Sequence, residues 1–150
     1  MVVNKINEQL KTLKKKGEII VINDFSKEQY QKFEKLENIH LIKILNLNEN
    51  VGSQKAISIG LNYIYKNYDD SQVVTVLDSD GEDDVSQIPK MINKAIQNPN
   101  HVVVSCRTKR KEKIIFKVLY FLHKIITFIA TFNWISFGNY SSFMSKNINS

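Results

Sequence analysis

The sequence predicts an α/β fold with a mostly parallel sheet and helices on both of its faces. Three short β-branched runs (residues 18–22, 40–45 and 73–77) alternate with segments whose apolar residues recur at helical spacing. The length of 150 residues and the hydrophobic content of 43% are sufficient for one domain with a substantial core. We therefore expect residues 1–150 to form a single domain.

The first expected helix covers residues 4–16, because Ile6, Leu10 and Leu13 would share one face. Gly17 is expected to end this helix. Residues 1–3 are too few for a full strand. Further helices are expected at residues 27–36, 53–65 and 86–96, the last ending near an Asn-Pro-Asn sequence. A fourth strand is expected at residues 101–105.

Residues 113–137 differ from the rest of the chain. Their polar residues recur every three or four positions and would form one stripe on an otherwise apolar helix. Three lysines interrupt the apolar run, which argues against a helix that spans a membrane. The pattern fits a helix in the interface of an anionic membrane, and equally a helix packed on the sheet with its lysine stems extended.

The charge of the chain limits its partners. The formal net charge is +6, carried by nineteen lysines and two arginines, with a basic cluster at residues 107–117. Such a charge suits a phosphate-rich ligand or an anionic membrane surface. The basic cluster lacks the interleaved aromatic residues typical of single-strand binders, so we expect no nucleic-acid partner. The single cysteine, Cys106, excludes an internal disulfide and indicates a reducing, cytoplasmic location.

The most informative stretch is the acidic loop after the third strand. Five carboxylates occur within the seven positions 78–84. Ligands of open α/β sheets bind beyond the carboxyl ends of the strands. Asp78 and Asp80 could therefore face one ligand, and their oxygens suit Mg²⁺ or Mn²⁺ held together with substrate phosphates. The alternative interpretation is a solvated acidic turn that caps the next helix.

The order of short motifs resembles glycosyltransferase family 2. These motifs are Asn23-Asp24-x-Ser26, Asn50-x-Gly52, Asp78-Ser79-Asp80, Ile88-Pro89 and a strand ending at Arg107. The dolichyl- and polyprenyl-phosphate sugar transferases are the most similar branch. The resemblance covers residues 18–147. It implies a Rossmann-like GT-A fold, a nucleotide-diphospho-sugar donor, a divalent metal and a polyprenyl-phosphate acceptor at the cell envelope.

The resemblance also assigns roles to individual residues. It implies nucleotide-sugar binding by Glu8, Ile22, Asp24, Asp78, Ser79 and Arg107. It implies that the metal is bound by Asp80, with Glu82 also facing it. It implies catalytic roles for Asp78, Asp80 and Arg107. The enzyme would then lie peripherally on the cytoplasmic face of the membrane.

Both ends of the chain depart from the family pattern. Only the valines and Asn7-Glu8 of residues 2–8 match the family's first turn, so the first strand is expected to be incomplete. Asn139 lies near the position where many relatives carry an aspartate, and an arginine is missing after Phe143. We expect a chain truncated at both ends, with a partner chain as one source of the missing segments.

Two other functions fit parts of the sequence. One is a non-catalytic, membrane-associated remnant of such an enzyme. The other is a haloacid-dehalogenase-type phosphatase, since residues 77–81 resemble its nucleophile motif. No later Gly-Asp-x-x-x-Asp cluster supports the phosphatase. A calcium EF-hand loop fits worse, because Asp83 would occupy the position of its invariant glycine.

Overall fold

The computed structural model describes residues 2–27, 36–105 and 139–149. The expected helices at residues 27–36 and 113–137 lie largely or wholly outside this part, as does Arg107. The elements in chain order are α1 (Val2–Thr12), β1 (Gly17–Asn23), β2 (Ile39–Asn46), α2 (Ser53–Asn67), β3 (Val73–Val76), the 3₁₀ helix η1 (Val85–Gln87), α3 (Ile88–Gln97), β4 (Val103–Val104), β5 (Ser141–Met144) and the 3₁₀ helix η2 (Ser145–Asn149).

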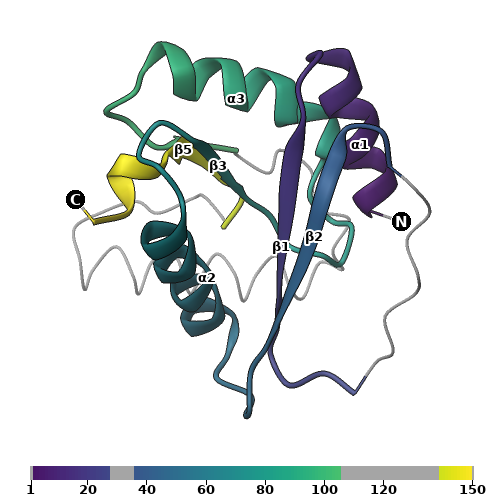
Figure 1. The fold of residues 1–150 in the computed structure, drawn as a ribbon, viewed down its shortest axis with the longest axis vertical. Helices are drawn as coiled ribbons and strands as arrows, with labels where there is room; N and C mark the ends of the chain where they lie inside the picture. The colour runs from purple at the N-terminus through teal and green to yellow at the C-terminus, as the bar shows by residue number, and fades with distance from the viewer. Residues whose placement is uncertain (1, 28–35, 106–138, 150) are drawn as a thin grey trace, which may run out of the picture.

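The strands form two separate sheets. β1 and β2 pair in parallel from Gly17–Ile39 to Asn23–Asn46. β5 lies between β3 and β4 and is antiparallel to both. Figure 1 shows β1 and β2 side by side, with β3 and β5 together below α3. Among the described residues no strand joins the two sheets, so β1 and β3 are each an edge strand.

Helices connect the two sheets. α2 packs on β1 so closely that a Cβ atom on Gly60 would lie 2.9 Å from Cγ1 of Ile22. α1 contacts both halves of the molecule. On one side the Asn7 side-chain oxygen accepts the Asn38 N–H at 3.0 Å. On the other, Ile6 packs against the core that α3 forms with β5.

One hydrophobic core holds α1, η1 and α3 together. It consists of Val85, Ile88, Met91 and Tyr140, and Val2, Ile6 and Leu77 pack around it. These residues come from α1, the segment after β3, η1, α3 and the residue before β5. Burial of such apolar side chains stabilises the fold by about 1.5–3 kcal/mol for each large residue. The acidic loop is therefore attached directly to this core.

The expectation of a mostly parallel sheet is not confirmed. The described residues give one parallel pair and two antiparallel pairs. The missed element is β5, whose sequence Ser-Ser-Phe-Met has little strand character. The strands expected near residues 18–22, 40–45, 73–77 and 101–105 are confirmed, as are the helices near 53–65 and 86–96.

The bounds expected for the first helix are wrong at both ends. It begins at Val2 because Val2 and Ile6 lie one turn apart and pack on the same core. It ends after Thr12 because Lys14 adopts a left-handed conformation with φ 51°. The Lys15 N–H then donates to the Leu10 carbonyl and the Lys14 N–H to Lys11, which is a Schellman cap.

No helix in the described ranges is long and apolar enough to cross a membrane.

Candidate functional site

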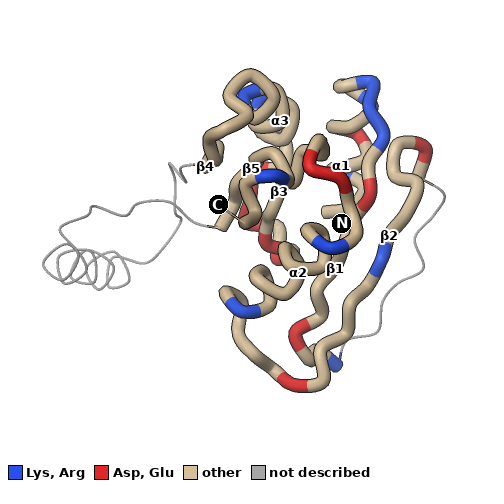
Figure 2. Tube along the Cα trace, turned by 60° about the vertical axis from the view of Figure 1, so that its left-hand side comes forward, with Lys and Arg blue, Asp and Glu red and all other residues tan. Residues whose placement is uncertain are grey.

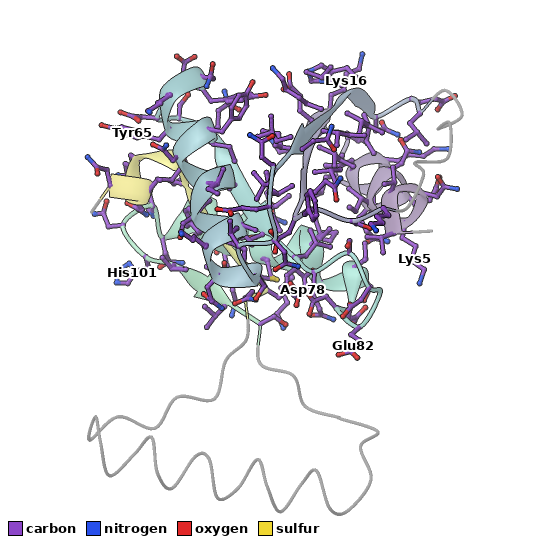
Figure 3. The ribbon with its side chains drawn as sticks, turned by 90° about the horizontal axis from the view of Figure 1, so that it is seen from below. Lys5, Lys16, Tyr65, Asp78, Glu82 and His101 are labelled. Atoms are coloured by element: carbon purple, nitrogen blue, oxygen red, sulfur yellow. The ribbon has the colours of Figure 1, made fainter. Side chains whose placement is uncertain are left out.

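The acidic loop between β3 and η1 is folded around its own carboxylates. The half-buried Asp78 donates its backbone N–H to Oδ2 of Asp83 at 2.9 Å. The Glu82 N–H donates to Oδ1 of Asp80 at 2.8 Å. Gly81, between Asp80 and Glu82, has φ 83°, a conformation that costs glycine little and other residues more. This turn leaves the Ser79, Asp80 and Glu82 side chains exposed, and Glu82 points away from the body of the molecule (Figure 3).

Asp83 does not fit the alternative interpretation of a solvated acidic turn. It is 5% exposed, because its carboxylate turns inward to accept the Asp78 N–H. Asp84 does behave as a cap, accepting the Ser86 N–H at 3.1 Å and the Ser86 hydroxyl at 2.7 Å. Hydrogen bonds from the Ser86 and Gln87 side chains lower the pKa of Asp84. Three of the five carboxylates, Asp80, Asp83 and Asp84, thus accept hydrogen bonds that maintain the loop.

Tyr140 anchors the loop from the side of β5. Its hydroxyl donates to the Asp84 carbonyl at 3.1 Å, and the side chain is 2% exposed. Burial, followed by the charges of Asp83 and Asp84, raises the pKa of Tyr140 to about 12. The hydroxyl therefore stays protonated as a donor across the physiological pH range. No signal in the sequence connects Tyr140 with a loop that lies 56 positions earlier.

A second loop, after β1, is fixed by Asp24. Its Oδ1 accepts the Val51 N–H at 2.7 Å and its Oδ2 accepts the Gly52 N–H at 2.9 Å. Asp24 thereby holds the segment that leads into α2. At the start of α2, Gln54 donates to the side-chain oxygen of Asn139 at 2.9 Å. The neighbouring Ile22 packs its side chain against α2 at Gly60.

These contacts place the two loops at the same edge of the molecule. Asn139 directly precedes Tyr140, and Ser141 pairs with Val76 at the carboxyl end of β3. The bonds of Asp24 to Gly52 and of Gln54 to Asn139 therefore connect the carboxyl end of β1 to the carboxyl end of β3.

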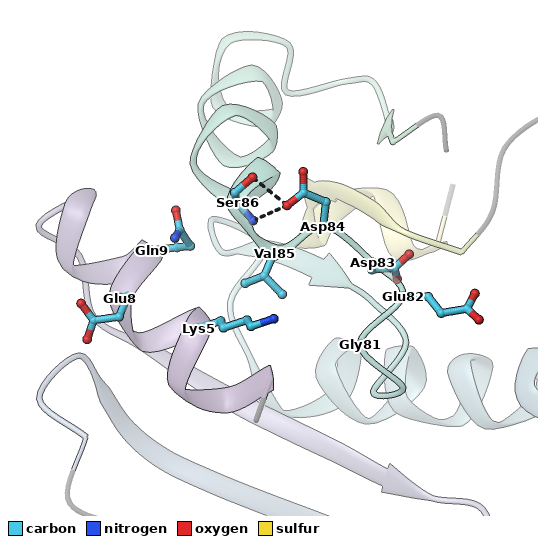
Figure 4. Close-up of a pocket in the computed structure, with 9 residues that line it drawn as sticks. All are labelled: Lys5, Glu8, Gln9, Gly81, Glu82, Asp83, Asp84, Val85 and Ser86. Atoms are coloured by element: carbon cyan, nitrogen blue, oxygen red, sulfur yellow. Dashed lines mark hydrogen bonds between the residues drawn. The ribbon is translucent and has the colours of Figure 1, made fainter. Parts of the chain in front are cut away.

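A cavity of about 450 Å³ lies between α1 and the acidic loop. Its lining residues are Lys5, Glu8, Gln9, Gly81, Glu82, Asp83, Asp84, Val85 and Ser86. Lys5 extends from α1 toward the loop, whereas the carboxylates of Glu8 and Glu82 point away from each other (Figure 4). The charge of Lys5 also contributes to the lowered pKa of Asp84. Sequence reasoning gave Lys5 no role, because its position relative to the loop depends on how α1 packs.

The acidic loop carries oxygen donors of the kind that bind a divalent metal when a substrate phosphate completes the coordination. The described residues contain no group of three His, Cys, Asp or Glu side chains that could hold a metal unaided. Mg²⁺, however, is commonly bound through one or two carboxylates together with substrate phosphates and water. Asp80 and Glu82, exposed on either side of Gly81, supply oxygen donors of this kind.

Lysines lie on several elements of the described part of the molecule, among them α1, β2, α2 and α3 (Figure 2). Three in succession, Lys14, Lys15 and Lys16, lie in the turn between α1 and β1. The basic cluster at residues 107–117 lies outside the described residues. Lys5 is the lysine that lines the cavity described above.

The described residues form an α/β protein with a loop of carboxylates at the carboxyl end of β3. The sequence profile of "Glycosyl transferase family 2" matches residues 2–145. The uncharacterized glycosyltransferase YkcC of Bacillus subtilis (strain 168) is 32% identical over 117 residues. That match covers 75% of this chain and 34% of YkcC, so the chain spans about a third of this curated relative. The chain belongs to glycosyl transferase family 2.

Proposed function

We propose that this chain transfers a sugar from a nucleotide-diphospho-sugar to an acceptor at the edge formed by its two loops. The observation that carries the proposal is the acidic loop. Asp83 and Tyr140 hold it in one conformation while Asp80 and Glu82 remain exposed. Pre-ordered charged groups at the end of a strand suit the binding of a diphosphate with its metal. Family membership supports the same chemistry.

Each predicted residue has a place in this proposal. Asp80 and Glu82 would hold Mg²⁺ or Mn²⁺, which when bound neutralises the charge of the departing diphosphate. Asp78 and Ser79 would contact the nucleoside and its phosphates. Lys5 adds a positive charge beside the loop that can attract the diphosphate.

The remaining predicted residues concern the nucleotide. Asp24 would lie along the nucleotide base together with Ile22, and Glu8 would face the nucleotide from α1. Asp24 also fixes the chain before α2, so it would shape the base site as well as line it. Arg107 would approach the diphosphate from the segment outside the described residues.

For the acceptor we propose a polyprenyl phosphate. A phosphate oxygen is already an anionic nucleophile, so its attack on the sugar requires no strong general base. Asn139 supports this choice, because it places a neutral amide rather than a carboxylate beside the end of β3. We further propose that residues 113–137 lie in the membrane interface on the cytoplasmic face, where such an acceptor is anchored.

The test is calorimetric titration of Mn²⁺ and a nucleotide-sugar into the wild type and two variants. Asp80→Asn should abolish most of the metal-dependent binding, because a charged oxygen donor becomes neutral. Asp84→Asn is the matched control in the same loop, since that side chain caps η1. Equal losses in both variants would indicate a diffuse acidic patch. Absence of binding by the wild type would favour a non-catalytic remnant.

A further inference from the structure

Phe25, at the tip of the loop after β1, combines two unfavourable features. Its backbone has φ 61°, in the left-handed region that bulky residues rarely adopt. Its side chain is also 55% exposed, although it is a large hydrophobic residue. Residues in such conformations cluster at active sites and ligand clamps, and among the described residues Phe25 forms no buried contact that would account for its strain.

The surrounding loop holds Phe25 in this conformation. The Asn23 side-chain oxygen accepts the Ser26 N–H at 2.9 Å, which closes a turn around residues 24 and 25. The Asn23 side-chain nitrogen donates to Asn46 at 2.9 Å, and the Asn23 carbonyl accepts the Leu47 N–H at 2.9 Å. Both strands of the β1–β2 sheet thus fix the turn, so the ring is presented from a rigid support.

Phe25 also lies next to the proposed nucleotide site. The preceding residue, Asp24, binds the amides of Val51 and Gly52. Through Gln54 and Asn139 this segment connects to the carboxyl end of β3, where the acidic loop begins. A ligand with its phosphates at the acidic loop would extend its other end along this edge toward the loop that carries Phe25.

We propose that Phe25 is the stacking surface for the base of the nucleotide. An exposed aromatic ring on a rigid turn provides an apolar face on which any base can stack. Such a contact would bind pyrimidine and purine nucleotides alike, because every base has a π face. Asp24 would fix the turn through Val51 and Gly52, and Phe25 would supply the contact. The inference rests on the proposed function, which places a nucleotide at this edge.

The test compares ligands with and without a base. UDP, GDP and pyrophosphate are titrated in the presence of Mn²⁺ into the wild type, Phe25→Gly, Phe25→Trp and Leu41→Ala. Stacking on an aromatic residue corresponds to about 5- to 150-fold in affinity. Phe25→Gly should lower the affinity for UDP and GDP by that factor and leave the affinity for pyrophosphate unchanged. Phe25→Trp should retain UDP and GDP affinity. Leu41, a hydrophobic residue on β2 that is 44% exposed, is the matched control and should show no effect.

Urea unfolding of the same variants separates stacking from a structural role. Glycine adopts φ 61° readily, so Phe25→Gly should be at least as stable as the wild type while binding nucleotide more weakly. Lower stability with unchanged UDP affinity would overturn the inference and leave the proposed function intact. Equal loss of UDP and pyrophosphate would overturn it as well. Absence of binding of all three ligands by the wild type would refute the proposed function, and this inference with it.

Discussion

The buried carboxylate of Asp83 should contribute more to stability than any exposed acid in the chain. Asp83→Ala removes the acceptor for the Asp78 N–H, which lies 2.9 Å from Oδ2 in the wild type. A hydrogen bond to a charged group contributes about 1.5–3 kcal/mol. The free energy of unfolding should fall by about that amount. For a chain of this size, the loss corresponds to a decrease of about 3–12 °C in the melting temperature.

Urea unfolding followed by far-ultraviolet circular dichroism measures this effect, with an unchanged m value as evidence that both proteins unfold in the same way. The control is Asp70→Ala, which removes an exposed acid at a turn and should change stability by less than about 0.5 kcal/mol. If Asp83→Ala is no less stable than Asp70→Ala, Asp83 does not organise the acidic loop. The proposal that Asp83 holds the acidic loop in one conformation would then be wrong.

Three further predictions follow from other contacts. The hydrogen bonds from Tyr68 and His40 lower the pKa of Glu18. The Glu18–Tyr68 contact should therefore contribute fully to the free energy of unfolding above pH 4.5, the ordinary pKa of this side chain, and less as the pH falls below that value. The same contact raises the pKa of Tyr68 to about 12, so the contribution should also be complete below pH 10 and decline toward pH 12. Melting temperatures of wild type and Tyr68→Phe that differ by the same amount at pH 3 and pH 7 would contradict this. Gly60→Ala should lower the free energy of unfolding by about 1–3 kcal/mol more when it is made in the wild type than when it is made in the Ile22→Ala variant. The reason is that the new Cβ atom would lie 2.9 Å from Cγ1 of Ile22. Additive effects in this double-mutant cycle would show that α2 moves without cost. Finally, the chain should sediment with anionic vesicles at low salt and less at high salt, since each lysine near such a surface contributes about 1 kcal/mol. Replacement of the three lysines in residues 113–137 by glutamine should reduce sedimentation, and a wild type that stays in the supernatant would exclude the interface helix.

The parts of the fold that follow from local pattern could be predicted from the sequence. β1 and β2 are β-branched runs bounded by polar loops, and α2 shows helical periodicity from its first residue. The acidic loop was also placed correctly after β3, because a buried strand followed by charge marks an edge of a sheet. These elements depend on residues close together in the chain.

The remaining features depend on contacts between distant residues. Tyr140 reaches the acidic loop across 56 positions, and β5 takes its position from pairing with β3 rather than from the propensity of its residues. The burial of Asp83 depends on the direction in which the chain turns at Gly81, which hydropathy does not report. The Schellman cap at Lys14 escaped prediction because a glycine usually occupies that position, and Gly17 was three residues away.

The separation of the two sheets affects how the site can change. Within the described residues the loop carrying Phe25 follows a strand of one sheet and the acidic loop follows a strand of the other. The helices α1 and α2 pack between the two sheets. The affinity for a nucleotide that contacts both loops would depend on the distance between the two sheets. Substitutions on the face of α1 that packs on the core, for example at Ile6, would then alter affinity by changing that distance. Because the two loops belong to different sheets, the packing of the helices between them can tune the site.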